Sequence, residues 1–169
     1  MKIFNNLFLF FIGGFLAGLT SLIFLAIIPI ASIKSDYLLI TLISLVEEFI
    51  KLVSLSFMVM LTTSFSRFKY YIYLAIAFGL SFSLFELSLL LLGNTYFLNY
   101  SFLLTTLVHV TTAVILLFAL KRGLVKSHNK RINQNQVFAG QELSTRLASL
   151  FILAFFIHLC YNLIILKLV

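Results

Sequence analysis

The residues best suited to chemistry form a short cluster, Glu47, Glu48 and Lys51, inside a long apolar stretch of the sequence. On an α-helix the two glutamates point about 100° apart, and Lys51 falls between them one turn later, so a single ammonium group can reach both carboxylates. One charge at the centre of a membrane span costs roughly 2.5 to 3.5 kcal/mol, so three in one span require a reason. A carboxylate in such a place can take a proton from water, as general base catalysis requires.

Four more polar residues interrupt later apolar stretches: Glu86, His109, His158 and Asn162. His158 and Asn162 are one helical turn apart and share a face. Carboxylates and imidazoles together provide what hydrolysis by an activated water requires, namely a base, groups that hold the water or a metal ion, and donors for the oxyanion. Zinc binds both ligand types, so the sequence is compatible with zinc or with no metal. If a metal is bound, its expected ligands are Glu48, Glu86, His109 and His158.

The composition places these residues in a membrane. Of the 169 residues, 62% are hydrophobic and only 10% are charged, and the mean hydropathy is +1.15, which excludes a soluble domain. The formal charge of +7 comes from residues near the ends of the apolar stretches, where Lys and Arg set membrane topology. The lipid bilayer is therefore the expected partner, and nucleic acid is not.

The apolar stretches predict an all-α polytopic membrane protein, one bundle of five transmembrane helices that forms a single domain over residues 1–169. The expected spans are about 3–31, 37–63, 70–93, 98–120 and 147–166, and residues 121–146 are expected to form a basic, solvated cytoplasmic loop. Of the 12 Lys and Arg, nine would lie inside, two outside and one, Lys51, within the membrane if the N-terminus is inside. The positive-inside rule therefore predicts an inside N-terminus.

Each of these features also has a structural interpretation. Gly14 and Gly18 form a small-residue face, which predicts close helix packing within the monomer rather than a dimer contact. A lone Glu86 or His109 can serve as a hydrogen-bonding group between helices, worth about 0.6 kcal/mol on average. Together, the ionisable residues could instead form a proton or cation path in a transporter or channel subunit.

The order of the motifs resembles that of the PrsW-type intramembrane proteases, relatives of the CAAX prenyl endopeptidases and of the bacterial CPBP membrane proteins. The matching motifs, on four successive predicted spans, are Glu47-Glu48-x-x-Lys51, Phe82-x-x-x-Glu86, an isolated His109 and His158-x-x-x-Asn162. The CAAX branch has an Arg one position after Lys51 and a His in place of Glu86, so the chain is more similar to the PrsW branch. The resemblance implies a peptidase of the bacterial cytoplasmic membrane that cleaves a membrane protein or peptide, such as an anti-sigma factor. Other members of the clan act in bacteriocin immunity, so a noncatalytic binding protein is an alternative.

The resemblance also implies roles. Glu47 would be the general base, with Glu48 and Lys51 fixing its charge state and orientation and Phe82 in support. Glu86 and His109 would hold the water or a metal ion. His158 and Asn162 would donate to the oxyanion, as the corresponding pair is thought to do in the CAAX branch.

The predicted spans also give the depth of these groups. Counted at 1.5 Å per residue from the outer span ends, they lie roughly 6 to 16 Å below the outer surface. A substrate helix would therefore unwind near its extracytoplasmic end.

Overall fold

The computed structural model describes residues 2–28, 33–62, 68–92, 98–130 and 137–168, and these form five α-helices without any strand. The helices are α1 (Lys2–Ile27), α2 (Asp36–Leu61), α3 (Phe68–Leu92), α4 (Leu98–Lys130) and α5 (Val137–Leu168). The prediction of an all-α protein with helices at these places is confirmed.

Four of the five helices, α1, α3, α4 and α5, are long and apolar enough to cross a membrane. The helix α2 is also long, with 26 residues, or about 39 Å against a hydrocarbon core of about 30 Å. Its centre, however, carries Glu47, Glu48 and Lys51, three charged residues that interrupt its apolar sequence. The structure thus supports a multi-pass membrane protein with four candidate spans, and a fifth span in α2 stays a prediction.

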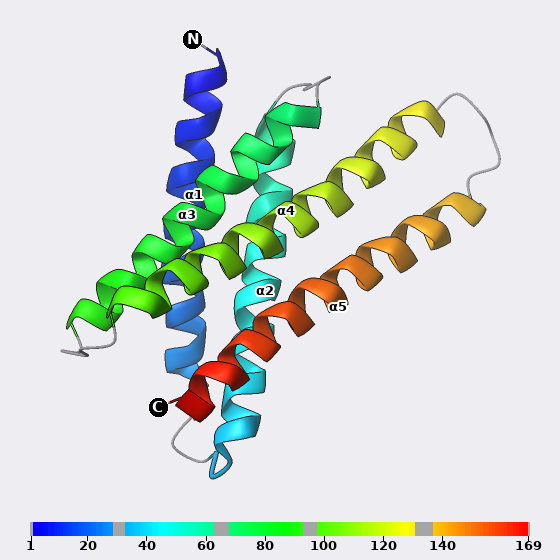
Figure 1. Ribbon diagram of the computed structural model, residues 1–169. Helices are drawn as coiled ribbons and strands as arrows, with labels where there is room; N and C mark the ends of the chain where they lie inside the picture. Colours follow the sequence, from blue (N-terminus) through cyan, green and yellow to red (C-terminus); the bar gives the residue numbers. More distant parts are fainter. Residues whose placement is uncertain (1, 29–32, 63–67, 93–97, 131–136, 169) are drawn as a thin grey trace.

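Consecutive helices run in opposite directions (Figure 1). The N-terminus, the end of α2 and the adjoining ends of α4 and α5 lie at one end of the bundle, which is the upper end in the figure. The start of α2, the end of α3 and the C-terminus lie at the other end. The helices α4 and α5 cross α2 obliquely, so a group on them lies less deep in a membrane than a count along the helix suggests.

The predicted loop over residues 121–146 is wrong for residues 121–130 and 137–146, which are helical, while residues 131–136 lie outside the described residues. The helix α4 continues to Lys130, and α5 already begins at Val137, so both helices extend past the apolar part of the sequence. The apolar stretch ends at Leu120, but Lys, Arg, Gln and Glu are good helix formers and continue the backbone helix into a polar region. The end of the apolar stretch therefore marked the end of the span and not the end of the helix.

Glycines allow α1, α3 and α4 to approach closely. A Cβ atom at Gly14 would lie 2.2 Å from the backbone oxygen of Phe78, and one at Gly79 would lie 2.6 Å from the Cα of Val110. A Cβ at Gly18 would lie 2.6 Å from the ring of Phe85. Gly14 and Gly18 thus pack within the monomer, as predicted, and bring the α1 backbone directly against α3.

We expect Gly14→Ala to destabilise the bundle, because its new methyl group meets a backbone carbonyl that cannot move aside alone. Forced overpacking of this kind costs typically about 1 to 3 kcal/mol. Gly13→Ala is the matched control, since a Cβ there meets only the flexible end of Met58 at 2.8 Å. The measurement is the midpoint of thermal unfolding in detergent, and equal midpoints for the two variants would contradict the close contact between α1 and α3.

The polar stripe of α2 faces the interior of the bundle. Ser44, Glu47, Glu48 and Lys51 are all buried, whereas Phe49 and Val53 on the opposite side are exposed. From Leu55 onward the buried side of α2 becomes apolar and joins a hydrophobic core with α1, α3, α4 and α5. The interior therefore has a polar half near the start of α2 and an apolar half near its end.

Candidate active site

Lys51 lies at the centre of a buried polar cluster. Its Nζ is 2.6 Å from Glu48 Oε1, 2.7 Å from His109 Nδ1 and 3.5 Å from Thr112 Oγ1. An ammonium group has three N–H donors, and these three acceptors account for all of them. Glu48 and Lys51 are both fully buried, so their ion pair is shielded from water. The Glu47 carboxylate, in contrast, points toward His158 on α5.

Phe82 of α3 supports this arrangement. Lys51 Nζ lies 4.5 Å from the centre of the Phe82 ring, a cation–π contact, and that ring is 4.8 Å from the imidazole of His109. Phe82 is fully buried. The Phe82-x-x-x-Glu86 motif therefore places an aromatic face under the Lys51 ammonium and, one turn later, a carboxylate beside His109.

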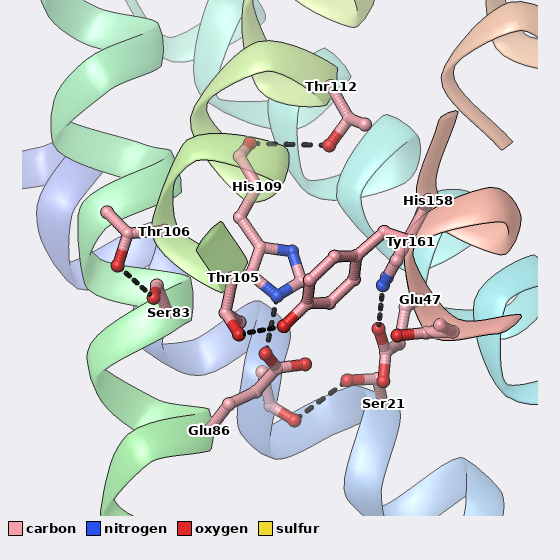
Figure 2. Close-up of polar contacts among 12 residues, drawn as sticks. Ser21, Glu47, Ser83, Glu86, Thr105, Thr106, His109, Thr112, His158 and Tyr161 are labelled. Carbon is pink, nitrogen blue, oxygen red and sulfur yellow. Dashed lines mark hydrogen bonds and ion pairs between the residues drawn. The ribbon is translucent and has the colours of Figure 1, made fainter. Parts of the chain in front are cut away.

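His109 links Lys51 to Glu86, and Figure 2 shows its bond with Glu86. Because Lys51 Nζ carries only donors, His109 Nδ1 accepts, and the ring proton of a neutral imidazole is then on Nε2. His109 Nε2 in turn donates to Glu86 Oε2. The tautomer of His109 is thus set by its two neighbours, and the Glu86 carboxylate is held by an N–H bond at the edge of a cavity.

His158 lies between the two glutamates of α2. Its Nδ1 is 2.8 Å from Glu48 Oε1, and its Nε2 is 3.3 Å from Glu47 Oε2. The rings of His109 and His158 are 5.0 Å apart and nearly perpendicular. One imidazole therefore contacts the buried Glu48 on one side and Glu47, at the cavity, on the other.

A cavity of about 270 Å³ adjoins these groups. It is lined by Ile40, Ile43, Glu47, Glu86, His158, Tyr161, Asn162 and Ile165. This is room for several water molecules, and its polar lining offers them partners. The Glu47 Oε2 atom is buried and makes no hydrogen bond in the described structure, whereas 23% of the Glu86 side chain is exposed. Glu48 does not line this cavity, although its Oε2 is also without a hydrogen bond.

Asn162 lies at the same cavity, one turn after His158. Its Nδ2 donates to Ser44 Oγ at 2.9 Å, and the Ser44 hydroxyl donates to the carbonyl of Ile40 at 2.9 Å. Because the hydroxyl proton is used in this way, Ser44 Oγ acts as the acceptor and fixes which end of the amide faces α2. An amide has two N–H groups, so the second can serve another acceptor in the cavity.

The donor atoms of Glu47, His109 and His158 lie within 4.8 Å of one another, and these residue types fit zinc. The set differs from the predicted ligands, because Glu48 is bonded to Lys51 and His158 while Glu47 faces the cavity. In the arrangement described, His109 Nδ1 accepts from the Lys51 ammonium and Nε2 carries the proton donated to Glu86, so His109 would bind zinc only after that proton is lost. A zinc ion held here would polarise a carbonyl or activate water.

All the residues singled out from the sequence as catalytic or supporting are brought together. They come from four helices: Glu47, Glu48 and Lys51 from α2, Phe82 and Glu86 from α3, His109 from α4, and His158 and Asn162 from α5. Two further contributors were not singled out. Thr112 contacts Lys51, and Tyr161 lines the cavity and shares a hydrogen bond with Thr105. Both could have been predicted from the sequence, because Thr112 is three residues after His109 and Tyr161 three after His158, and residues at this spacing share a helix face.

No protein-family model, curated protein or solved structure matches this chain. The fold and the polar cluster themselves define the class: a helical, multi-pass membrane protein with a buried cluster of carboxylates and imidazoles.

Proposed function

We propose that this protein is an intramembrane peptidase, which hydrolyses a peptide bond of a membrane-spanning protein or peptide with a water activated by Glu47. The observation that carries the proposal is the shared cavity, in which Glu47, Glu86, His158 and Asn162 face one space large enough for water. General base, water-holding group and oxyanion donor are the parts that such a reaction needs. The order of the motifs, as in PrsW-type proteases, agrees with this function.

In the proposed mechanism Glu47 takes a proton from a water molecule held beside Glu86. The resulting hydroxide attacks the carbonyl carbon, and the negative charge moves to the carbonyl oxygen, where the free N–H of Asn162 donates to it. Glu47 then gives its proton to the leaving amine, and the C–N bond breaks. His158 Nε2, 3.3 Å from Glu47, keeps that carboxyl aimed into the cavity, and Glu48 holds His158 from the other side.

The same proposal includes α2 as a fifth span and an N-terminus on the cytoplasmic side of a bacterial membrane. Its charges then need no contact with lipid, because Glu48 and Lys51 are fully buried and contact each other, His158 of α5 and His109 of α4. The cytoplasmic side would correspond to the end of the bundle that holds the N-terminus and the long ends of α4 and α5. The cavity then faces the outer half of the membrane.

A proton path is the second candidate, favoured by one observation. Glu86, His109, Lys51, Glu48 and His158 form a continuous series of polar contacts through the bundle. Beyond this series, however, the interior is closed by buried apolar side chains, among them Leu55, Leu74, Phe78, Leu116 and Leu117. A path needs polar groups or water on both sides, so the structure favours a site over a pathway.

The test is to map the cut in a single-span substrate by mass spectrometry after incubation with the purified protein in lipid nanodiscs. We expect a scissile bond in the outer third of the substrate span, within roughly 16 Å of the outer surface, because Glu47 and Asn162 lie toward that end of their helices. A cut near the cytoplasmic end would overturn the orientation or the choice of site. If the purified protein cleaves no membrane-spanning peptide in nanodiscs but conducts protons when it is reconstituted in liposomes, the proton path is favoured.

A further inference from the structure

A second hollow lies on the outside of the bundle, between α4 and α5. This groove, of about 440 Å³, is lined mainly by apolar side chains, including Leu104, Leu107, Phe156, Cys160 and Ile164. Several of them are highly exposed, with 62% for Leu107 and 53% for Phe156. In a membrane the groove faces the hydrocarbon, where a partner would have to be apolar.

Tyr161 belongs to both hollows. It lines the groove between α4 and α5 as well as the polar cavity that contains Glu47. Its hydroxyl shares a hydrogen bond with Thr105 of α4, which joins the two helices beside the groove (Figure 2). The side chain of Tyr161 is thus the wall between a bilayer-facing apolar surface and the groups proposed to activate water.

The other seams of the bundle are less suited to admit a substrate. The α1 backbone is in direct contact with α3 at Gly14, and α3 with α4 at Gly79. The seam between α2 and α5 contains Glu48, His158, Ser44 and Asn162, whose bonds hold the site itself together. Opening that seam would dismantle the site, whereas moving Tyr161 breaks its hydrogen bond with Thr105, a bond between neutral groups of a kind worth about 0.5 to 1.5 kcal/mol.

We propose that the groove between α4 and α5 receives one transmembrane helix of the substrate, and that Tyr161 is the residue that admits its unwound segment to the cavity. The inference rests on the proposed peptidase function. A helix fits the apolar groove because its backbone hydrogen bonds are satisfied internally. Water reaches the scissile bond from the other side, through the polar cavity.

The first experiment measures docking without cleavage. The chain has a single cysteine, Cys160, which is exposed in the groove, and it has no tryptophan. We attach bimane to Cys160 of the Glu47→Gln protein in nanodiscs and add a polyleucine-based single-span peptide with one Trp and an Asn-Gly pair in its outer third. We expect saturable quenching of bimane by the Trp. The matched control carries bimane at Leu16→Cys in a Cys160→Ala background, on the exposed side of α1, and should show only weak, nonsaturating quenching.

The second experiment fills the groove. Leu107→Trp places a bulky ring in it, and Leu103→Trp, one turn earlier and 69% exposed, is the control outside its lining. We expect Leu107→Trp to lower kcat/KM for the same peptide about tenfold, through KM, which corresponds to about 1.4 kcal/mol of binding. Tyr161→Phe and Thr105→Val, which remove the bond between α4 and α5, should each raise kcat/KM.

The outcomes separate the two proposals. Saturable quenching at Cys160 without any cleavage by the wild-type protein would keep the docking surface and overturn the peptidase function. If Leu107→Trp cleaves at the wild-type rate and Glu47→Gln does not cleave, the peptidase function is kept and the docking surface is overturned. Equal quenching at Cys160 and at the α1 control position, together with quenching of both by a spin-labelled phospholipid, would show a groove filled by lipid and would overturn the docking of a helix.

Discussion

Glu47→Gln should abolish proteolysis while leaving the protein folded and abundant in the membrane. The amide has the volume of the carboxyl group but cannot accept a proton from water, so a rate loss of about 10²- to 10⁴-fold is expected. Folding should be little affected, because Glu47 lies beside the cavity and the amide oxygen of glutamine can still face His158 Nε2, 3.3 Å away. The measurement is the rate at which the purified variant cleaves a single-span peptide.

The matched control is Asp36→Asn, which makes the same carboxyl-to-amide change at the exposed first residue of α2. It should cleave at the wild-type rate. Wild-type turnover by Glu47→Gln would remove Glu47 as the base. If Glu47→Gln is as active as the wild type in cells and neither of these two proteins cleaves a peptide, a noncatalytic binding protein is favoured instead.

Lys51→Met should lower both the amount of protein and its activity. The change leaves the fully buried Glu48 carboxylate without its counter-charge, and removing one partner of a buried ion pair costs about 3 to 5 kcal/mol. It also removes the donors that hold His109 Nδ1 and the cation that rests on the Phe82 ring. The measurements are the level of the variant in isolated membranes and its midpoint of thermal unfolding in detergent.

Lys34→Met is the control for this variant, since Lys34 is an exposed lysine just before α2. Its level and unfolding midpoint should match those of the wild type. The double change Lys51→Met with Glu48→Gln should recover part of the lost stability, because no buried charge is then left unpaired. A Lys51→Met protein that is abundant, stable and active would show that the ion pair does not hold the site.

Periodicity and hydropathy were enough to predict most of this fold. Five apolar stretches, broken where residues such as Pro29 and Arg67 occur, became five helices whose bounds differ by at most four residues from the predicted spans, except that α4 ends at 130 instead of 120 and α5 begins at 137 instead of 147. Hydropathy did not predict the ends of α4 and α5 beside residues 131–136, because it reports where a helix leaves the membrane, while backbone helicity depends on propensity.

The sequence also predicted which residues form the site, but it did not predict which of these residues contact one another. Intramembrane Glu, Lys and His are costly unless they meet, which predicted that they gather. Which glutamate faces the cavity depends on how α2 is rotated against α4 and α5, and this rotation comes from the packing of apolar side chains. It left Glu47 at the cavity, while Glu48 pairs with Lys51 on its own helix and with His158 of α5.

The contacts of α2 also constrain how the chain is made in the cell. The partners of its charged residues are far downstream, with His109 58 residues after Lys51 and His158 110 residues after Glu48. At roughly 5 to 20 residues per second, a ribosome needs on the order of ten seconds to reach His158 after it has made α2. During that interval the ion pair between Glu48 and Lys51, three residues apart on α2, already neutralises these two charges. For α2 to span the membrane as proposed, the insertion machinery has to retain it, or let it wait at the membrane surface, until α4 and α5 are synthesised and enclose its charges.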